Sequence, residues 1–307
     1  MTNFVFLANC EIALALAGWA VGLWGIVSGS AVILAYLYFL AWYPYILFLD
    51  GILFRLKGNS WLLNRPRDFL KLLVWSTTIW LVFEALNLVL NNWGYVGVIS
   101  TWWVRWGGYA VSFATVLPGV LLTAEVIEAL GLFQNVKGRT YNLGLWQPVA
   151  LVIGVVMLVV PLVWPHYTFA LIWGTTFFLL DPFCELLGGP SLIARFAARE
   201  RREHLCLLAA GLVCGLWWES WNWFATSKWV YTLPVLNFWK VFEMPVLGYI
   251  GFAPFALECA VMYNFIKALD ERVLTTPARR RAAWLVQLAF WLLMFAAMDA
   301  WTVISYQ

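Results

Sequence analysis

The chain has 307 residues, of which 64% are hydrophobic and only 11% are charged, whereas a soluble domain carries about 25% charged residues. This deficit extends over the whole length, so it excludes an ordinary soluble domain and predicts a helical integral membrane protein. The net charge is only +3, and the chain has no basic stripe, zinc finger or glycine-rich phosphate loop, so we expect no nucleic-acid partner.

Nine apolar segments predict an all-α transmembrane bundle of about nine spans. We place the spans at residues 4–27, 31–54, 69–91, 107–132, 146–163, 166–186, 204–226, 244–268 and 283–304. The first is predicted to be a retained span, because it lacks a basic leader, carries Glu11 and is too long for a signal peptide.

Basic residues predict the orientation, since Lys and Arg are enriched in cytoplasmic loops. The loops after spans 2, 4, 6 and 8 carry Arg55, Lys57, Arg65, Arg67, Lys137, Arg139, Arg195, Arg199, Arg201, Arg202, Arg272, Arg279, Arg280 and Arg281. The loops on the other side carry Arg105, Lys228 and Lys240. We therefore expect a cytoplasmic N-terminus and an external C-terminus in the inner (cytoplasmic) membrane of a bacterium or archaeon.

Rare polar residues recur at constant separations, and this pattern predicts an internal repeat. One separation relates Arg67 to Arg202, Glu84 to Glu219 and Asn87 to Asn222, and after a one-residue slip it relates Trp93 to Trp229 and Tyr95 to Tyr231. A slightly shorter separation is shared by the pairs Trp42–Trp173, Asp50–Asp181, Gly58–Gly189 and Ser60–Ser191. We predict a first four-span repeat at 1–140, a second at 141–275 in the same orientation, and an extra C-terminal span at 276–307. The pseudo-twofold axis is then expected to run along the membrane normal.

The chain is rich in tryptophan, with 22 residues. Many lie near predicted outer boundaries, as in an interfacial aromatic belt. Trp217, Trp218, Trp221 and Trp223 instead share one helical stretch, so some must face the bundle interior.

A polar cluster near the predicted outer ends of the spans forms the candidate site. Buried charges are expensive without partners. A glutamic acid in a water-poor aromatic site can hold its proton and act as a general acid, and aromatic faces can stabilise a carbocation. The candidate catalytic residues are Glu84, Glu219, Glu243 and Glu258, and the candidate substrate-binding residues are Asn87, Asn222, Trp218, Trp221, Tyr231, Tyr249, Lys240 and Arg105. Alternatively, the two Glu-x-x-Asn faces hydrogen-bond across the repeat interface as scaffold.

A second acidic cluster lies near the predicted cytoplasmic ends and comprises Asp50, Asp181, Glu185, Glu125 and Glu128. We expect salt bridges to the nearby arginines, with a divalent ion at Asp181 and Glu185 as the alternative. No metal ligand set or cofactor is assigned. The five cysteines are expected in the core, His166 and His204 at span boundaries, and Glu11 and Asp299 without a role.

The run Phe242-Glu243-Met244-Pro245, followed by Pro254-Phe255-Ala256-Leu257-Glu258, resembles the membrane carotenoid enzymes, namely the lycopene-cyclase-like domains and the carotenoid hydratases. The resemblance covers only a short stretch around these two runs, and it implies acid-initiated chemistry on a polyene, with Glu243 and Glu258 as acids. The chain departs from that family in having a lone Glu258, where the cyclases carry adjacent glutamates, and in having four spans per repeat.

Three functions are compatible with these patterns. The first is a membrane enzyme, such as an isoprenoid cyclase, hydratase or isomerase, that acts on an apolar lipid in an aromatic cavity. The second is a non-catalytic subunit that binds quinone, pigment or lipid alongside other membrane subunits. The third is a transporter of an apolar solute, although repeats in the same orientation provide alternating access less directly than inverted ones.

Overall fold

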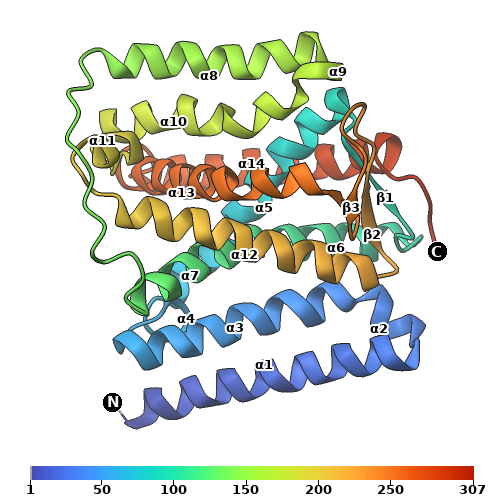
Figure 1. The fold of residues 1–307 in the computed structure, drawn as a ribbon. Helices are drawn as coiled ribbons and strands as arrows, with labels where there is room; N and C mark the ends of the chain where they lie inside the picture. The colour runs from blue at the N-terminus through green and yellow to red at the C-terminus, as the bar shows by residue number, and fades with distance from the viewer. Residues whose placement is uncertain (1) are drawn as a thin grey trace.

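The structure is a computed structural model that describes residues 2–307, and it is a bundle of long helices with two small sheets at one end (Figure 1). The helices are α1 (Thr2–Ser28), α2 (Ala31–Ala35), α3 (Leu37–Lys57), α4 (Trp61–Asn64), α5 (Pro66–Leu90), α6 (Trp102–Phe113), α7 (Val116–Ala129), α8 (Trp146–Val163), α9 (Pro165–Thr168), α10 (Thr175–Leu186), α11 (Leu192–Ala197), α12 (Arg202–Phe224), α13 (Tyr249–Arg272) and α14 (Pro277–Trp301). Two 3₁₀ turns are η1 (Phe169–Gly174) and η2 (Val246–Gly248), and the strands are β1 (Trp93–Val96), β2 (Lys228–Tyr231), β3 (Lys240–Val241) and β4 (Met244–Pro245). The predicted helical bundle is confirmed, and the short strands are an addition that the sequence did not predict.

Among residues 2–307, eight helical segments are long and apolar enough to cross a membrane. They are Asn3–Ser28, Leu37–Lys57, Pro66–Leu90, Trp102–Ala129, Trp146–Val163, Pro165–Leu186, Val246–Arg272 and Pro277–Trp301. The remaining predicted span corresponds to α12, which has 23 residues but is less apolar because it carries Arg202, Glu203, Glu219 and Asn222. The chain is thus a helical protein of membrane type, and its ninth span remains a prediction.

Local sequence signals explain several helix ends. Helix α3 ends at Gly58, whose φ of 69° lies in the left-handed region that glycine adopts without strain. Helix α5 begins with Pro66, at a position that needs no backbone donor, and ends at Asn91 in the left-handed conformation. Helix α14 begins with Pro277, and the preceding Thr276 side chain accepts a hydrogen bond from the backbone N–H of Arg279.

The two ends of the bundle differ in character. We call the end with β1–β4 the strand end, and the opposite end, where the arginine-rich loops lie, the basic end. The chain termini lie at opposite ends of the bundle (Figure 1).

Strands β1 and β2 pair antiparallel at the strand end. Trp93 pairs with Tyr231, Gly94 with Val230 and Tyr95 with Trp229. Trp93 matches Trp229 and Tyr95 matches Tyr231 in the sequence. If each residue is replaced by its match in the other strand, the same pairs result. The register is therefore symmetric about the Gly94–Val230 pair. The two segments that match in sequence therefore meet around a local twofold axis.

The same contacts recur in the two halves at the basic end. Asp50 accepts hydrogen bonds from the Ser60 hydroxyl and from the backbone N–H groups of Trp61 and Leu62, at 2.6 to 3.1 Å. Asp181 accepts the corresponding bonds from Ser191, Leu192 and Ile193, at 2.6 to 3.1 Å. Each aspartate thereby holds the turn that follows its own helix.

Reciprocal aromatic pairs join the halves in the centre. Trp42 on α3 packs against Trp218 on α12 with ring centroids 4.9 Å apart. Trp173, which matches Trp42, stacks on Phe83 of α5 at 5.2 Å. Phe83 directly precedes Glu84 and Trp218 directly precedes Glu219, so these two residues match as well. Each half therefore inserts a tryptophan against the other half.

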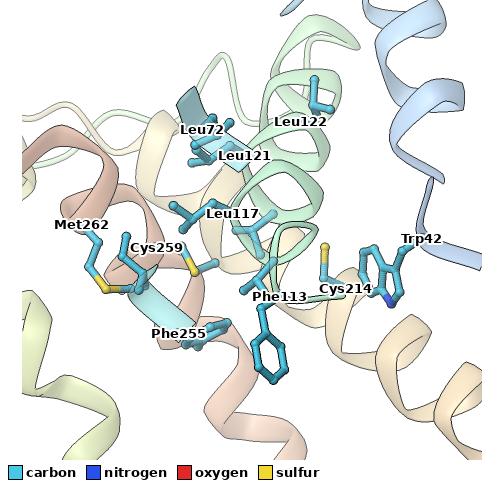
Figure 2. Packing of buried hydrophobic residues seen from close by; sticks show 14 of the residues in the cluster. Trp42, Leu72, Phe113, Leu117, Leu121, Leu122, Cys214, Phe255, Cys259 and Met262 are labelled. Carbon is cyan, nitrogen blue, oxygen red and sulfur yellow. The ribbon is translucent and has the colours of Figure 1, made fainter. Parts of the chain in front are cut away.

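The core is apolar and close-packed. Trp42, Phe113, Leu117, Phe255 and Met262 gather there from α3, α6, α7 and α13 (Figure 2). Four of the five cysteines are buried and all are free, which confirms that they are small core residues for the most part.

Candidate functional site

Glu84 on α5 lies in an aromatic cage and is fully buried. Its Oε1 atom accepts hydrogen bonds from Trp80 Nε1 at 2.9 Å, Trp93 Nε1 at 3.1 Å and the Tyr95 hydroxyl at 2.6 Å. Its Oε2 atom has no partner among residues 2–307. Three donors on one oxygen stabilise negative charge there.

Glu219 on α12 is equally buried but has fewer donors. The Tyr231 hydroxyl donates to its Oε1 at 2.7 Å, and its Oε2 has no partner in the described part of the chain. The position that matches Trp80 is Gly215, and a side chain there would collide with the ring of Phe252. Glu219 thus has no donor in the place of Trp80, and Trp229, which matches Trp93, donates to the Tyr231 hydroxyl instead, so the Glu219 carboxyl group is less fully bonded.

The tyrosines of the two strands act as fixed donors. Burial, together with the neighbouring carboxyl group, raises the pKa of Tyr95 and Tyr231 well above the usual value. Both hydroxyl groups therefore remain protonated at neutral pH and donate to Glu84 and Glu219.

Asn87 and Asn222 hold the strands in place. The Asn87 amide donates to the Trp93 carbonyl at 2.8 Å and accepts from the Trp93 N–H. Asn222 makes the same pair of bonds to Trp229, at 2.9 and 3.0 Å. Each Glu-x-x-Asn face therefore binds its own strand, not its counterpart across the interface as the scaffold alternative expected.

Glu258 on α13 has no acidic counterpart in the first half. Its Oε2 accepts from the Thr176 hydroxyl at 2.6 Å, and its buried Oε1 has no partner among the residues that the structure describes. Pro118 and Pro254 are the same number of residues apart in the sequence as Trp93 and Trp229, and so are Leu122 and Glu258. In this alignment Leu122 is the residue that matches Glu258. An apolar position in the first half is therefore an acid in the second.

Two of the remaining candidates at the strand end, Glu243 and Tyr249, are bonded to residues outside the candidate set. Glu243 accepts from Lys228 Nζ at 2.8 Å, and the Tyr249 hydroxyl donates to the Val241 carbonyl at 3.0 Å. Lys240 on β3 is exposed. Trp218 is buried and Trp221 half-buried, whereas Trp217 and Trp223 are exposed, so the tryptophans of α12 face both inward and outward as predicted.

Arg105 pairs with Asp299, so the expectation that Asp299 has no role is wrong. The Arg105 Nε atom donates to Asp299 Oδ1 at 2.7 Å, and Nη1 donates to the carbonyls of Ile99 and Ser100. Trp106 Nε1 also donates to the Asp299 carboxylate at 2.8 Å. The pair fastens α14 to α6.

We expect Arg105→Met to lower the unfolding free energy by about 3 kcal/mol, because Asp299 would lose its charged partner in a largely buried setting. The measurement is thermal unfolding in detergent. The control is Lys71→Met, which removes the more exposed Lys71–Asp270 pair and should cost less than about 1 kcal/mol. Equal effects of the two substitutions would show that the Arg105 pair is not a structural fastener.

The acids at the basic end are only partly salt-bridged. Arg202 lies 3.6 Å from Glu128, as expected. Asp50 and Asp181 bind hydroxyl and backbone N–H groups instead of arginines, and Glu185 accepts from Gln147. Within residues 2–307, no group of three or more His, Cys, Asp or Glu residues is arranged to hold a metal ion.

The two histidines lie where they were expected. His204 in the first turn of α12 bonds through both ring nitrogens to the carbonyls of Glu200 and Leu192. His166 lies in the short helix α9 between two apolar segments.

Two small cavities lie near the basic end. One of about 150 Å³ is lined by residues that include Trp61, Glu128 and Tyr263, and one of about 100 Å³ by residues that include Gly188 and Arg272. None of the four candidate acids lines either cavity. Glu84, Glu219 and Glu258 are at most 1% exposed, so they are enclosed by the surrounding chain.

Neither a family model, nor a curated protein, nor a solved structure matches this chain.

Proposed function

We propose that the chain is an integral membrane enzyme that performs acid-initiated chemistry on an apolar, isoprenoid-like lipid. The observation that carries the proposal is a set of three buried glutamates, each with one bonded carboxyl oxygen and one that is unpaired within the described chain: Glu84, Glu219 and Glu258. Leaving a buried polar atom unpaired costs free energy. Each such atom needs an explanation, and at Glu219 and Glu258 a ligand that uses the free oxygen would supply one.

The chemistry needs a protonated carboxyl group beside a carbon–carbon double bond. The acid transfers its proton to one carbon of the double bond, and a carbocation forms on the other. Aromatic faces such as those of Trp173, Trp218 and Phe255 stabilise this charge. Return of a proton from an adjacent carbon to the carboxylate completes a cyclisation or isomerisation, and addition of water completes a hydration.

Glu258 and Glu219 are the preferred acids. Each receives one hydrogen bond from a hydroxyl group, whereas Glu84 receives three from aromatic donors. Fewer donors leave the neutral acid better stabilised relative to the carboxylate. Glu243 is bonded to Lys228 and is better suited to holding its loop in place.

The fuller architecture is part of the proposal. We infer nine spans arranged as two four-span repeats in the same orientation, followed by α14. The symmetric strand register, the matching Asp50 and Asp181 turns and the reciprocal tryptophan pairs support the duplication. The distribution of Lys and Arg supports a cytoplasmic N-terminus and an external C-terminus.

A second candidate is a non-catalytic subunit of a membrane complex that binds lipid, quinone or pigment. Two observations favour it: the cavities described above lie away from the glutamates, and Asn87 and Asn222 are used within their own strands. Under this alternative the glutamates are structural.

Purification from native membranes in a gentle detergent separates the two. Bound lipids would be extracted and identified by mass spectrometry, and co-purifying proteins would be quantified. A co-purifying isoprenoid or polyene with no stoichiometric protein partner is the result we expect. Stoichiometric protein partners without accumulation of a lipid precursor in a deletion strain would contradict the enzyme proposal and favour the subunit.

A further inference from the structure

Glu84 and Glu219, which match each other in the sequence, are covered very differently at the strand end. Strand β1 is buried, with Trp93 and Tyr95 less than a tenth exposed, whereas all four residues of β2 are half-exposed. The outer edge of β1 is paired with the C-terminal tail: Tyr95 N–H donates to the Thr302 carbonyl, and Ile304 N–H donates to the Tyr95 carbonyl, at 2.8 and 2.7 Å. Glu84, beneath β1, is thus sealed by the chain terminus.

The segments that follow the two strands differ as well. After β1 the chain forms helix α6, which the Arg105–Asp299 pair fastens to α14. After β2 it forms an irregular loop with the short β3–β4 hairpin and η2, spanning residues 232–248. We call residues 232–248 the cover, since they continue from β2, whose Tyr231 donates to Glu219, and since Phe242 contacts Trp223 of α12 with ring centroids 6.3 Å apart.

The first residues of the cover are fixed to the bundle. Thr232 bonds to the backbone carbonyls of Asn91 and Asn92, and Leu233 and Val235 pack against a small apolar cluster at the end of α5.

The part of the cover beyond Val235 has fewer interactions, among them the bond from the Tyr249 hydroxyl to the Val241 carbonyl. Its charged tie to β2 is the ion pair between Lys228 Nζ and Glu243, and Val246 N–H bonds within the cover to the Trp239 carbonyl. Lys228 also lies 5.1 Å from the ring of Trp223. Breaking the ion pair would remove the charged tie between β2 and the part of the cover beyond Val235.

The cover is strained and apolar on its outside. Leu236, Trp239 and Phe242 have φ values of 60°, 50° and 57°, which are costly for bulky side chains. Trp239 is 80% exposed, and Phe238, in edge contact with it, is 49% exposed. Strained backbone of this kind clusters at ligand clamps and switch regions, and aromatic side chains are favoured at the bilayer interface.

We propose that residues 232–248 are an opening cover over Glu219, latched by the Lys228–Glu243 pair, and that Glu219 is the member of the symmetric pair that an apolar ligand reaches from the bilayer at the strand end. Glu84 remains sealed by β1 and the C-terminal tail. The inference rests on the proposed function only for the identity of the natural ligand. Access to Glu219 can be measured without any turnover.

The test uses dicyclohexylcarbodiimide, an apolar reagent for protonated carboxyl groups, on the full chain in native membranes. The carboxyl O–H adds across one C=N bond of the reagent, and the resulting O-acylisourea rearranges to a stable N-acylurea that remains on the glutamate. Mass spectrometry of the digested protein then gives the labelling rate at Glu84, Glu219 and Glu258 separately. Glu84 serves as the internal control, because its burial matches that of Glu219.

We expect Glu219 to be labelled at least about tenfold faster than Glu84, because only Glu219 lies under a segment that can open locally. Lys228→Met should raise the Glu219 rate about fivefold, the change expected for loss of a partly exposed ion pair. Glu243→Gln breaks the same pair from the other side and should have the same effect, and Lys71→Met should change nothing. Truncation after Thr302 should raise labelling at Glu84 and leave Glu219 unchanged.

Equal labelling rates of Glu84 and Glu219 in the unmodified chain would contradict the proposal that residues 232–248 open over Glu219. So would an unchanged Glu219 labelling rate in both Lys228→Met and Glu243→Gln. Failure of the enzyme proposal has a different signature. In that case Glu219 would still be labelled selectively, and no lipid would be converted.

Discussion

Glu258→Gln is expected to lower turnover of the lipid substrate by at least about 100-fold, the contribution typical of a general acid. Glutamine has almost the same shape and can still accept the hydrogen bond from Thr176, but it has no carboxylic proton to transfer to a double bond. Thermal stability in detergent should therefore change little. The measurement is conversion, in membranes, of the lipid identified by purification, followed by chromatography.

Glu219→Gln should also abolish turnover, because Glu219 is the second acid that lacks a full set of donors. Glu84→Gln is the matched control, since Glu84 is its symmetric counterpart. This change should lower stability by about 1–2 kcal/mol, because the three donors to Oε1 would face a neutral amide oxygen, which is a poorer acceptor than a carboxylate. It should leave turnover within a few-fold. Full activity of both Glu258→Gln and Glu219→Gln would refute the acid mechanism. If the two variants only unfold, the glutamates are scaffold.

Gly211→Ala is expected to destabilise the bundle by about 3 kcal/mol, the upper part of the range for overpacking a close-packed interior. Helix α12 crosses α13 at this residue. A Cβ atom at Gly211 would lie 2.1 Å from the Phe252 carbonyl oxygen and 3.0 Å from the Ala253 Cα atom. Both are backbone atoms, so the clash can be relieved only by moving the two helices apart. Thermal unfolding in detergent measures the loss.

Gly251→Ala is the control for this prediction. It lies in the helix that Gly211 contacts, yet a Cβ atom there meets no other atom of the described chain within 4 Å. Alanine is the better helix former by about 1 kcal/mol, so the variant should be as stable as the unmodified chain or more so. A Gly211→Ala protein as stable as Gly251→Ala would mean that α12 and α13 do not cross as closely as described.

Resemblance to the carotenoid enzymes implied that Glu243 and Glu258 are candidate acids. Their surroundings separate them. Glu243 lies in the cover and is paired with Lys228, whereas Glu258 lies in the core beneath Phe255 and is bonded to a threonine hydroxyl on α10. The two residues are close in sequence, but of the two only Glu258 has the buried, unpaired oxygen that proton transfer requires.

The sequence by itself determined the helical membrane class and most element positions, because apolar runs of about 20 residues have few alternatives to a spanning helix. It also marked the residues that matter. Glu84, Asn87, Glu219 and Asn222 are rare polar residues in apolar surroundings, and burying them without partners is costly, so their positions were informative. After a one-residue slip, the same comparison matched Trp93 with Trp229 and Tyr95 with Tyr231, and these four residues lie in the two strands that pair.

Only the tertiary structure determined which strands pair and which polar side chains bond to each other. Strands as short as Trp93–Val96 and Lys228–Tyr231 have too few residues to show a period, and their pairing joins segments that lie far apart in the sequence. The Arg105–Asp299 pair likewise joins residues 194 positions apart. Whether a buried glutamate receives three hydrogen bonds or one depends on what packs beside it. Trp80 donates to Glu84, whereas the matching position beside Glu219 is Gly215, which has no side chain to donate. Hydrophobic patterning fixes which residues are buried, but it contains no information on which buried groups meet.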